Sequence, residues 1–134
     1  MRRIIMATVI AIALIGAHAA TASADVTELN VEITSATLLD PGHVLIEGTV
    51  TCDAPASFGY IDVSLRQRGG PFGFRAGYGL ESMSCDTTPT PFSLVVVGGP
   101  FHGGPAVFDM FAVACDDFGQ CAFDQSFGTL RISQ

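Results

Sequence analysis

The sequence predicts an all-β fold held by disulfide bonds, and three observations support this. Apolar residues recur with period two in a chain rich in Val, Thr, Phe and Ile, which is the pattern of half-buried strands. Turn-forming residues, 15 Gly and 7 Pro in 134 residues, separate these runs at short intervals. The chain also contains four Cys, and an even number is typical of small exported disulfide-bonded domains.

The first 24 residues predict a cleaved secretory signal peptide. Two arginines after Met1 precede an apolar run over residues 4–17, and a stretch of small residues follows over 19–24. This order of basic, apolar and small segments predicts cleavage between Ala24 and Asp25. A membrane anchor is the disfavoured alternative, because the apolar run is shorter than the roughly 20 residues that a span needs. We therefore expect residues 25–134 to form one secreted domain that is released into the medium rather than tethered.

The charge of residues 25–134 restricts the class of partner. This segment has thirteen acidic residues against four arginines, a formal charge of −9. Such a surface repels phosphate groups, which predicts that the protein binds neither nucleic acid nor anionic membranes. The acidity instead favours solubility or a cationic partner. We expect a monomer that needs no cofactor and binds a protein or a small molecule.

Alternating apolar residues and turn signals predict seven strands, at residues 26–39, 44–52, 60–68, 76–85, 92–97, 106–115 and 121–132. The fourth is weakly patterned and is expected at an edge, whereas the sixth is apolar throughout and is expected to be central. Three alternate residues of the third strand are expected to face the core: Ile61, Val63 and Leu65. Between the first two strands, Pro41 and Gly42 predict a turn in which Gly42 has a positive φ.

Seven short strands with closely spaced turns predict a seven-stranded immunoglobulin-like antiparallel β-sandwich stapled by two disulfides. A small Greek-key barrel is the alternative. Cys115 and Cys121 flank a short hairpin loop, so we expect them to face each other and pair, which leaves Cys52 to pair with Cys85. The alternative pairing, Cys52 with Cys115, would imitate the bridge between the two sheets of an immunoglobulin domain.

Four short motifs carry a resemblance to a known group of proteins. They are GTVTC at residues 48–52, IDVSLRQ at 61–67, Cys85-Asp86, and FHGGPAV at 101–107. The chain resembles small secreted actinobacterial proteins that have a G-T-x-x-C strand, a V-x-L-x-Q strand and an F-x-x-G-x-A strand. The resemblance implies an immunoglobulin-type sandwich and secretion, and it implies no activity. The Cys115–Cys121 clip also resembles that of the neocarzinostatin-like carriers, although no ligand motif supports that likeness.

Two loops rich in Gly and Phe are the candidate binding surface. Phe72 and Phe74 alternate with Gly beside Arg75 in residues 69–77, and Phe101 lies beside His102 in residues 98–105. Aromatic side chains on loops at the end of a β fold commonly make binding contacts. We therefore expect a non-catalytic binding or interaction protein. The alternative is that these rings cap the ends of the core.

A secreted hydrolase or an enzyme inhibitor on the same scaffold is the alternative function. Four acidic residues are its candidates, Asp62, Glu81, Asp109 and Asp124, because pairs of carboxylates can hydrolyse glycosidic bonds. We expect Asp109 and Asp124 to lie on facing strands, although solvent-exposed strand positions are the favoured explanation for such acids. A structural protein of the cell envelope is a third class.

Other chemical sites have weaker signals. Asp116 and Asp117, near Asp124, suggest a Ca²⁺ site, but they lack the spacing of a calcium loop. The histidines, His43 in a turn and His102 in a loop, have no nucleophile motif beside them. We therefore assign no catalytic, cofactor or metal site.

Overall fold

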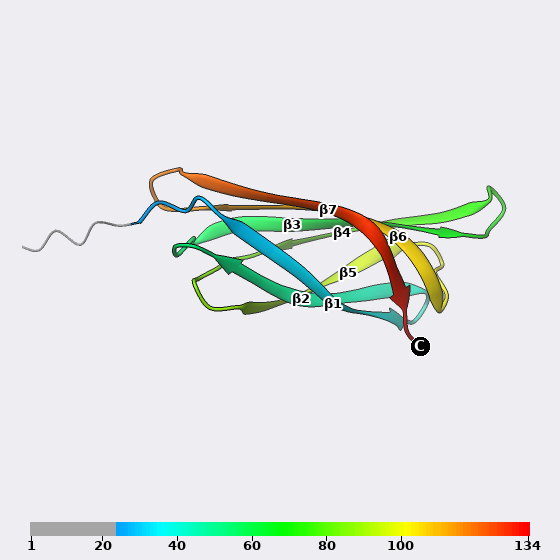
Figure 1. The fold of residues 1–134 in the computed structure, drawn as a ribbon. Coiled ribbons are helices and arrows are strands. Elements are labelled where there is room, and N and C mark those ends of the chain that lie inside the picture. Colours follow the sequence, from blue (N-terminus) through cyan, green and yellow to red (C-terminus); the bar gives the residue numbers. More distant parts are fainter. Residues whose placement is uncertain (1–23) are drawn as a thin grey trace, which may run out of the picture.

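The structure is a computed structural model that describes residues 24–134, so the predicted signal peptide lies outside the described residues apart from Ala24. Seven strands follow one another, with turns and loops between them. They are β1 (Leu29–Leu39), β2 (His43–Cys52), β3 (Phe58–Arg68), β4 (Phe74–Ser82), β5 (Thr90–Gly98), β6 (Gly104–Cys115) and β7 (Cys121–Ile132). The predicted all-β fold of seven strands is confirmed (Figure 1). Within residues 24–134, no helix is long and apolar enough to cross a membrane.

The strands form one antiparallel sheet in the order β1-β2-β5-β4-β3-β6-β7. Long ladders join β1, β2 and β5 on one side and β4, β3, β6 and β7 on the other. The two groups are the lower and upper layers in Figure 1, and they are connected at both margins. This nearly closed sheet is nearer to the small barrel that the sequence left as an alternative than to a sandwich of two separate sheets.

Glycine at two facing positions explains the connection between β4 and β5. These strands pair only at Gly77↔Gly98 and Tyr78↔Val97. A Cβ on Gly77 would lie 2.5 Å from the Val97 carbonyl oxygen, and a Cβ on Gly98 would lie 2.6 Å from the Ala76 carbonyl oxygen. The backbones can therefore approach only because side chains are missing. As a result β4 lies inside the sheet order, which corrects its expected place at an edge, although most of its length does not pair with β5.

Two contacts connect the ends of the sheet, β1 and β7. Ser133 follows β7 and exchanges backbone hydrogen bonds with β1, because its N–H donates to the Ala36 carbonyl and its carbonyl accepts from the Leu38 N–H, both at 2.8 Å. Further along, the Val31 N–H donates to the Asp124 Oδ2 atom at 2.7 Å. A side chain thus satisfies a backbone donor where strand pairing is missing.

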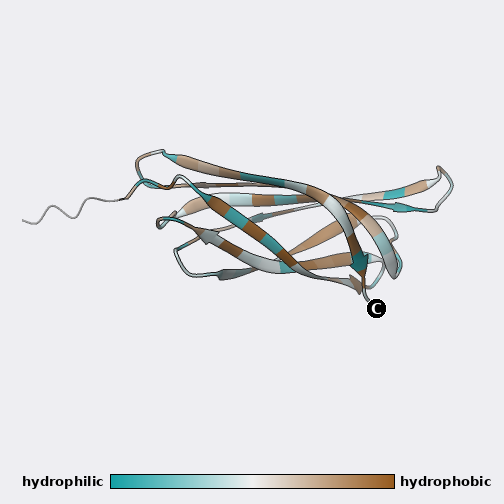
Figure 2. Ribbon diagram, in the orientation of Figure 1, coloured by the Kyte–Doolittle hydropathy of each residue, from teal (hydrophilic) through white to brown (hydrophobic). Residues whose placement is uncertain are grey.

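The core lies between the two groups of strands and follows the predicted alternation. Ile61, Val63 and Leu65 of β3 are fully buried, as expected, and so are Val44 and Ile46 of β2. Figure 2 shows apolar and polar residues alternating along most strands. The β1–β2 turn is also as predicted, with a φ of 107° at Gly42.

Both expected disulfides are present. Cys52 bonds to Cys85 with a Cα–Cα distance of 5.7 Å, and Cys115 bonds to Cys121 with a Cα–Cα distance of 4.0 Å. The alternative Cys52–Cys115 pairing is therefore wrong. Two disulfides indicate an oxidising compartment, because thiols are kept reduced in the cytosol.

Candidate functional site: the β3–β4 hairpin

The hairpin that joins β3 to β4 projects beyond the neighbouring loops at one end of the molecule (Figure 1). Its loop is shorter than predicted, because the strands continue to Arg68 and resume at Phe74. Gly69, Gly70 and Gly73 all have positive φ values, which turn the chain tightly at little steric cost. Phe74 and Arg75 therefore lie on a strand rather than in a flexible loop, and Phe72 is left at the tip.

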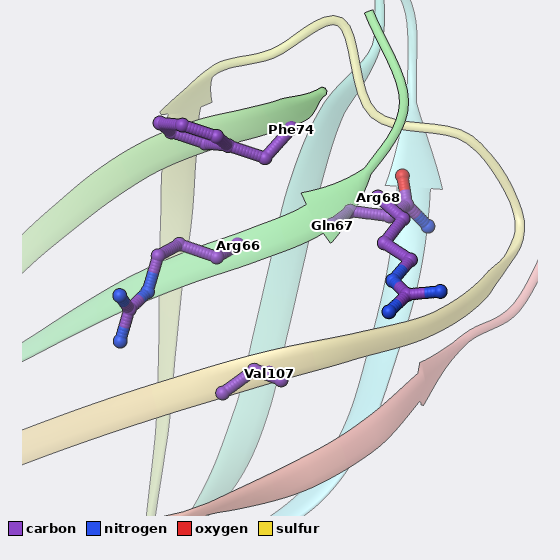
Figure 3. Close-up of a pocket in the computed structure, with 5 residues that line it drawn as sticks. All are labelled: Arg66, Gln67, Arg68, Phe74 and Val107. Atoms are coloured by element: carbon purple, nitrogen blue, oxygen red, sulfur yellow. The ribbon is translucent and has the colours of Figure 1, made fainter. Parts of the chain in front are cut away.

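A hollow of about 460 Å³ lies on one side of the hairpin (Figure 3). It is lined by Arg66, Gln67, Arg68, Phe74 and Val107. Strand register explains the group, because Arg68 is opposite Phe74 on β4 and Arg66 is opposite Val107 on β6. The hollow thus combines two guanidinium groups with an aromatic ring and an aliphatic side chain.

A second hollow, also of about 460 Å³, lies between the hairpin and the loop before β6. Pro71, Phe72, Arg75 and Pro100 are among its lining residues, and Phe74 borders both hollows. Phe72 is 87% exposed and Phe74 is 55% exposed. The structure therefore brings together Phe72, Phe74 and Arg75, three of the five predicted binding residues, around one accessible element.

Phe101 does not belong to this surface, which corrects the prediction. Its side chain is only 4% exposed, and a Cβ on Gly77 would lie 2.7 Å from its ring. Its backbone N–H donates to the Gly42 carbonyl at 2.8 Å, which ties the loop to the β1–β2 turn. Phe101 caps the end of the core, the role that the sequence left as the alternative.

His102 is exposed, but its backbone is fixed by a buried side chain. Gln67 is only 3% exposed; its Nε2 donates to the His102 carbonyl at 2.8 Å, and its Oε1 accepts from the His102 N–H at 3.0 Å. The imidazole Nδ1 lies 2.9 Å from the Gly103 carbonyl oxygen. Gln67 therefore explains why a glycine-rich segment holds one shape beside the hairpin, and sequence reasoning assigned it no role.

The predicted pair of Asp109 and Asp124 does not form. The β6–β7 register places Asp109 opposite Phe127 and Asp124 opposite Ala112, so the two carboxylates project from opposite faces of the sheet. Asp124 points toward β1, where it accepts the hydrogen bond from Val31. It is therefore a residue that helps to close the sheet.

Asp109 instead lies near Asp62, on the outer face of the sheet. Asp62 is opposite Phe111, and Asp109 is opposite Ser64, so the two acids are diagonal neighbours on β3 and β6. Partial desolvation, and then the nearby negative charge of Asp109, raise the pKa of Asp62. Tyr78 also has a raised pKa because of desolvation and then the charges of Asp62 and Tyr60. Neither acid lines the hollows beside the hairpin.

The remaining acidic residues have local hydrogen-bond partners or share no partner with one another. Glu81 is exposed near the end of β4. It lies in the same cross-strand row as Asp124, but β3 and β6 lie between their two strands. Asp116 Oδ1 accepts from the backbone N–H groups of Phe118 and Gln120 at 2.9 and 3.0 Å, which fixes the β6–β7 loop. Asp117 accepts from the Ser57 hydroxyl at 2.5 Å. Among residues 24–134, no three His, Cys, Asp or Glu side chains group closely enough to hold a metal ion.

Sequence reasoning missed the aromatic residues on the outer face of β4, β3, β6 and β7. The rings of Tyr60 and Phe111 have centroids 6.1 Å apart, and so do those of Phe111 and Phe123. Phe123 and Phe127 on β7 are 63% and 85% exposed. Register counted from the β6–β7 hairpin would have placed Phe111, Phe123 and Phe127 on one face.

The comparisons with known proteins give no relative. No family model matches the chain, and neither a curated protein nor a solved structure matches it significantly. The resemblance to small secreted actinobacterial proteins therefore stays a prediction from four short motifs.

Proposed function

We propose that the chain is a secreted, non-catalytic binding protein that contacts its partner through the β3–β4 hairpin. The exposure of Phe72 carries this proposal, since an aromatic ring 87% exposed at the tip of a projecting hairpin stabilises no core. Exposed aromatic rings that stabilise no core commonly serve as contacts for a partner.

The surroundings of Phe72 support the same function. Hollows on both sides of the hairpin give a partner concave surfaces to fill, and Phe74 borders both of them. Arg66, Arg68 and Arg75 add donors that can hold a carboxylate or a carbonyl. The base of the hairpin is rigid, because Phe101 is packed beneath it and Gln67 fixes the adjoining loop.

The finer fold assignment and secretion belong to the same proposal. An immunoglobulin-like domain has one sheet in the order 1-2-5-4 and another in the order 3-6-7, and the observed order β1-β2-β5-β4-β3-β6-β7 joins these two sequences end to end. Secretion is supported by the basic, apolar and small segments of residues 1–24 and by the two disulfides.

The test compares two exposed phenylalanines at opposite ends of the molecule. Phe118 is 75% exposed in the β6–β7 loop, so Phe118→Ala is a matched control for Phe72→Ala. Ligands are selected against the wild-type protein from a random peptide library and from a glycan array, and their affinities for both variants are measured. We expect Phe72→Ala to weaken the selected ligands by at least about tenfold, the effect of losing a central aromatic contact, while Phe118→Ala changes them little.

Two further measurements complete this test. Phe74→Ala is expected to weaken the same ligands, because Phe74 borders both hollows. Unfolding curves of all variants check that the fold is unchanged. Ligands that bind equally well to the wild type and to both hairpin variants would overturn the proposal that the hairpin is the binding element.

A further inference from the structure

The outer face of β4, β3, β6 and β7 exposes a group of large apolar side chains. Eight large side chains on it are exposed: Phe58, Tyr60, Phe74, Tyr78, Leu80, Val107, Phe123 and Phe127. Phe127 is 85% exposed, about as much as Phe72 at the hairpin tip. Contiguous exposed apolar patches above a few hundred Å² mark interaction surfaces.

The charged residues of this face are separated into two halves. Along β3, the outward positions read Asp62, Ser64, Arg66 and Arg68, and Asp109 on β6 extends the acidic half. Strand geometry puts Asp62 about 13 Å from Arg66, from a rise of about 3.3 Å per residue. The face therefore has a negative and a positive half on a common apolar surface.

We propose that this face binds a second copy of the chain in a face-to-face, two-fold symmetric dimer. The two-fold axis would lie between the two facing sheets, perpendicular to β3 and midway between the levels of Ser64 and Arg66. Rotation about this axis reverses the direction of β3, so the negative half of one copy faces the positive half of the other. It sets Asp62 of each copy against Arg68 of the other, and it brings Asp109 near the Arg66 of the other copy. An isologous interface needs this kind of self-complementarity.

Pairing with an arginine of the second copy would offset the charge repulsion between Asp62 and Asp109. Desolvation and the charge of Asp109 both disfavour ionised Asp62, and no arginine contributes to its pKa shift. Arg66 and Arg68 lie exposed beside the hollow of about 460 Å³, where the inverted second copy would place Tyr60 or Asp62. Each half of the face therefore carries the charge that would pair with the opposite half of a second copy.

The size of the face suits a dimer. Four strands spaced about 4.8 Å apart and about 36 Å long give a projected area of about 700 Å², close to the roughly 800 Å² that each partner buries in a standard interface. The charges favour a second copy over a general apolar ligand, because they match an inverted copy of themselves.

This inference goes beyond the proposed function, since the second copy would cover the sheet face and the hollow at Arg66 and Arg68. It would leave Phe72 and the second hollow, at Arg75, open to a partner. The same two-fold axis directs the two β3–β4 hairpins toward opposite ends of the dimer. A dimer would therefore present two copies of Phe72 on opposite sides and could bind two partners at once. The proposed dimer replaces the monomer that we expected from the sequence.

Charge reversal on the two halves tests the dimer. The wild type and the variants Asp62→Arg and Arg68→Asp are examined by sedimentation over a wide concentration range. We expect a concentration-dependent wild-type dimer, and a dimer dissociation constant raised at least about 100-fold in each variant, because each reversal creates two like-charge contacts across the axis. An equimolar mixture of the two variants is expected to recover dimerisation, because position 62 of each chain then faces a residue of opposite charge at position 68 of the other chain.

Controls separate this proposal from the proposed function. Phe127→Ser is expected to weaken the dimer without changing charge, whereas Phe72→Ala is expected to leave it intact. A wild type that sediments only as a monomer, or charge-reversed variants that dimerise as the wild type does, would overturn the dimer. A monomer whose outer face instead binds a peptide or a saccharide would overturn the dimer too. None of these outcomes changes the prediction that ligands bind at Phe72.

Discussion

Replacing Phe101 by Ala tests whether this residue supports the fold, as the structure shows, rather than forming a binding contact. The ring is 4% exposed, and it lies against Gly77 and Gly99, whose added Cβ atoms would be 2.7 and 3.0 Å from it. Removal of the ring leaves a cavity, and glycines have no side chains that could move into it. Phe→Ala substitutions in cores cost about 3–5 kcal/mol of unfolding free energy, and poor collapse of the site predicts the upper part of that range.

The expected loss is large for a domain of this size. Folded domains have unfolding free energies of about 5–15 kcal/mol, so Phe101→Ala would remove a substantial share. At roughly 4 °C per kcal/mol, the melting temperature should fall by about 12–20 °C. Urea unfolding followed by circular dichroism gives the free energy directly, and the chain has no Trp, so fluorescence would have to rely on its tyrosines.

Phe72→Ala is the matched control for this measurement. Phe72 is 87% exposed, and surface substitutions usually change the unfolding free energy by less than about 0.5 kcal/mol. The two variants should therefore differ by several kcal/mol although each removes one phenyl ring. A cost below about 1 kcal/mol for Phe101→Ala would refute the assignment of Phe101 to the core.

Three further predictions concern the residues that hold the domain together. Replacing both Cys52 and Cys85 by Ser should cost about 3.7 kcal/mol in urea unfolding, from chain entropy for a 33-residue separation; a loss below about 1 kcal/mol would contradict this. Hydrogen bonds from the Thr27 hydroxyl, and then from backbone N–H groups, lower the pKa of Asp53 to about 2. The stability that ionised Asp53 contributes is present above pH about 4 and should be lost as the pH falls to about 2, so Asp53→Asn should flatten this acid limb. Gln67→Met should speed amide hydrogen exchange at His102, because it removes both hydrogen bonds; unchanged exchange would show that other contacts hold the loop.

The strands and disulfides were predictable because each depends on local patterns in the sequence. Alternation in β3 places Ile61, Val63 and Leu65 inside, and all three are fully buried. The short separation of Cys115 and Cys121 requires facing positions across a hairpin, and the structure pairs these residues directly. Period and loop length are sufficient for inferences of this kind.

The closure of the sheet was not predictable from the same patterns. It depends on Gly77 and Gly98 meeting near the ends of β4 and β5 that lie farthest from their connecting loop, and a glycine inside a strand does not indicate which backbone it will approach. Phe101 illustrates the same problem. Its loop reads as flexible, but the space that its ring fills exists because Gly77 lies across from it.

The last strand shows why the outer face was missed. In β7 the phenylalanines face solvent, whereas Asp124 and Gly128 face inward, which inverts the usual rule that apolar residues lie inside. Two local contacts explain the inversion. Asp124 satisfies the unpaired N–H of Val31, and a Cβ on Gly128 would lie 3.2 Å from the ring of Phe108.

The register of the β6–β7 hairpin, with Cys115 opposite Cys121, would have placed Phe127 beside Asp109. It would have placed Asp124 on the other face, because successive side chains along a strand point to opposite faces of the sheet. Counting from the disulfide is therefore a stronger guide to facing in this strand than hydrophobicity, and it leads to the same face on which the dimer proposal rests.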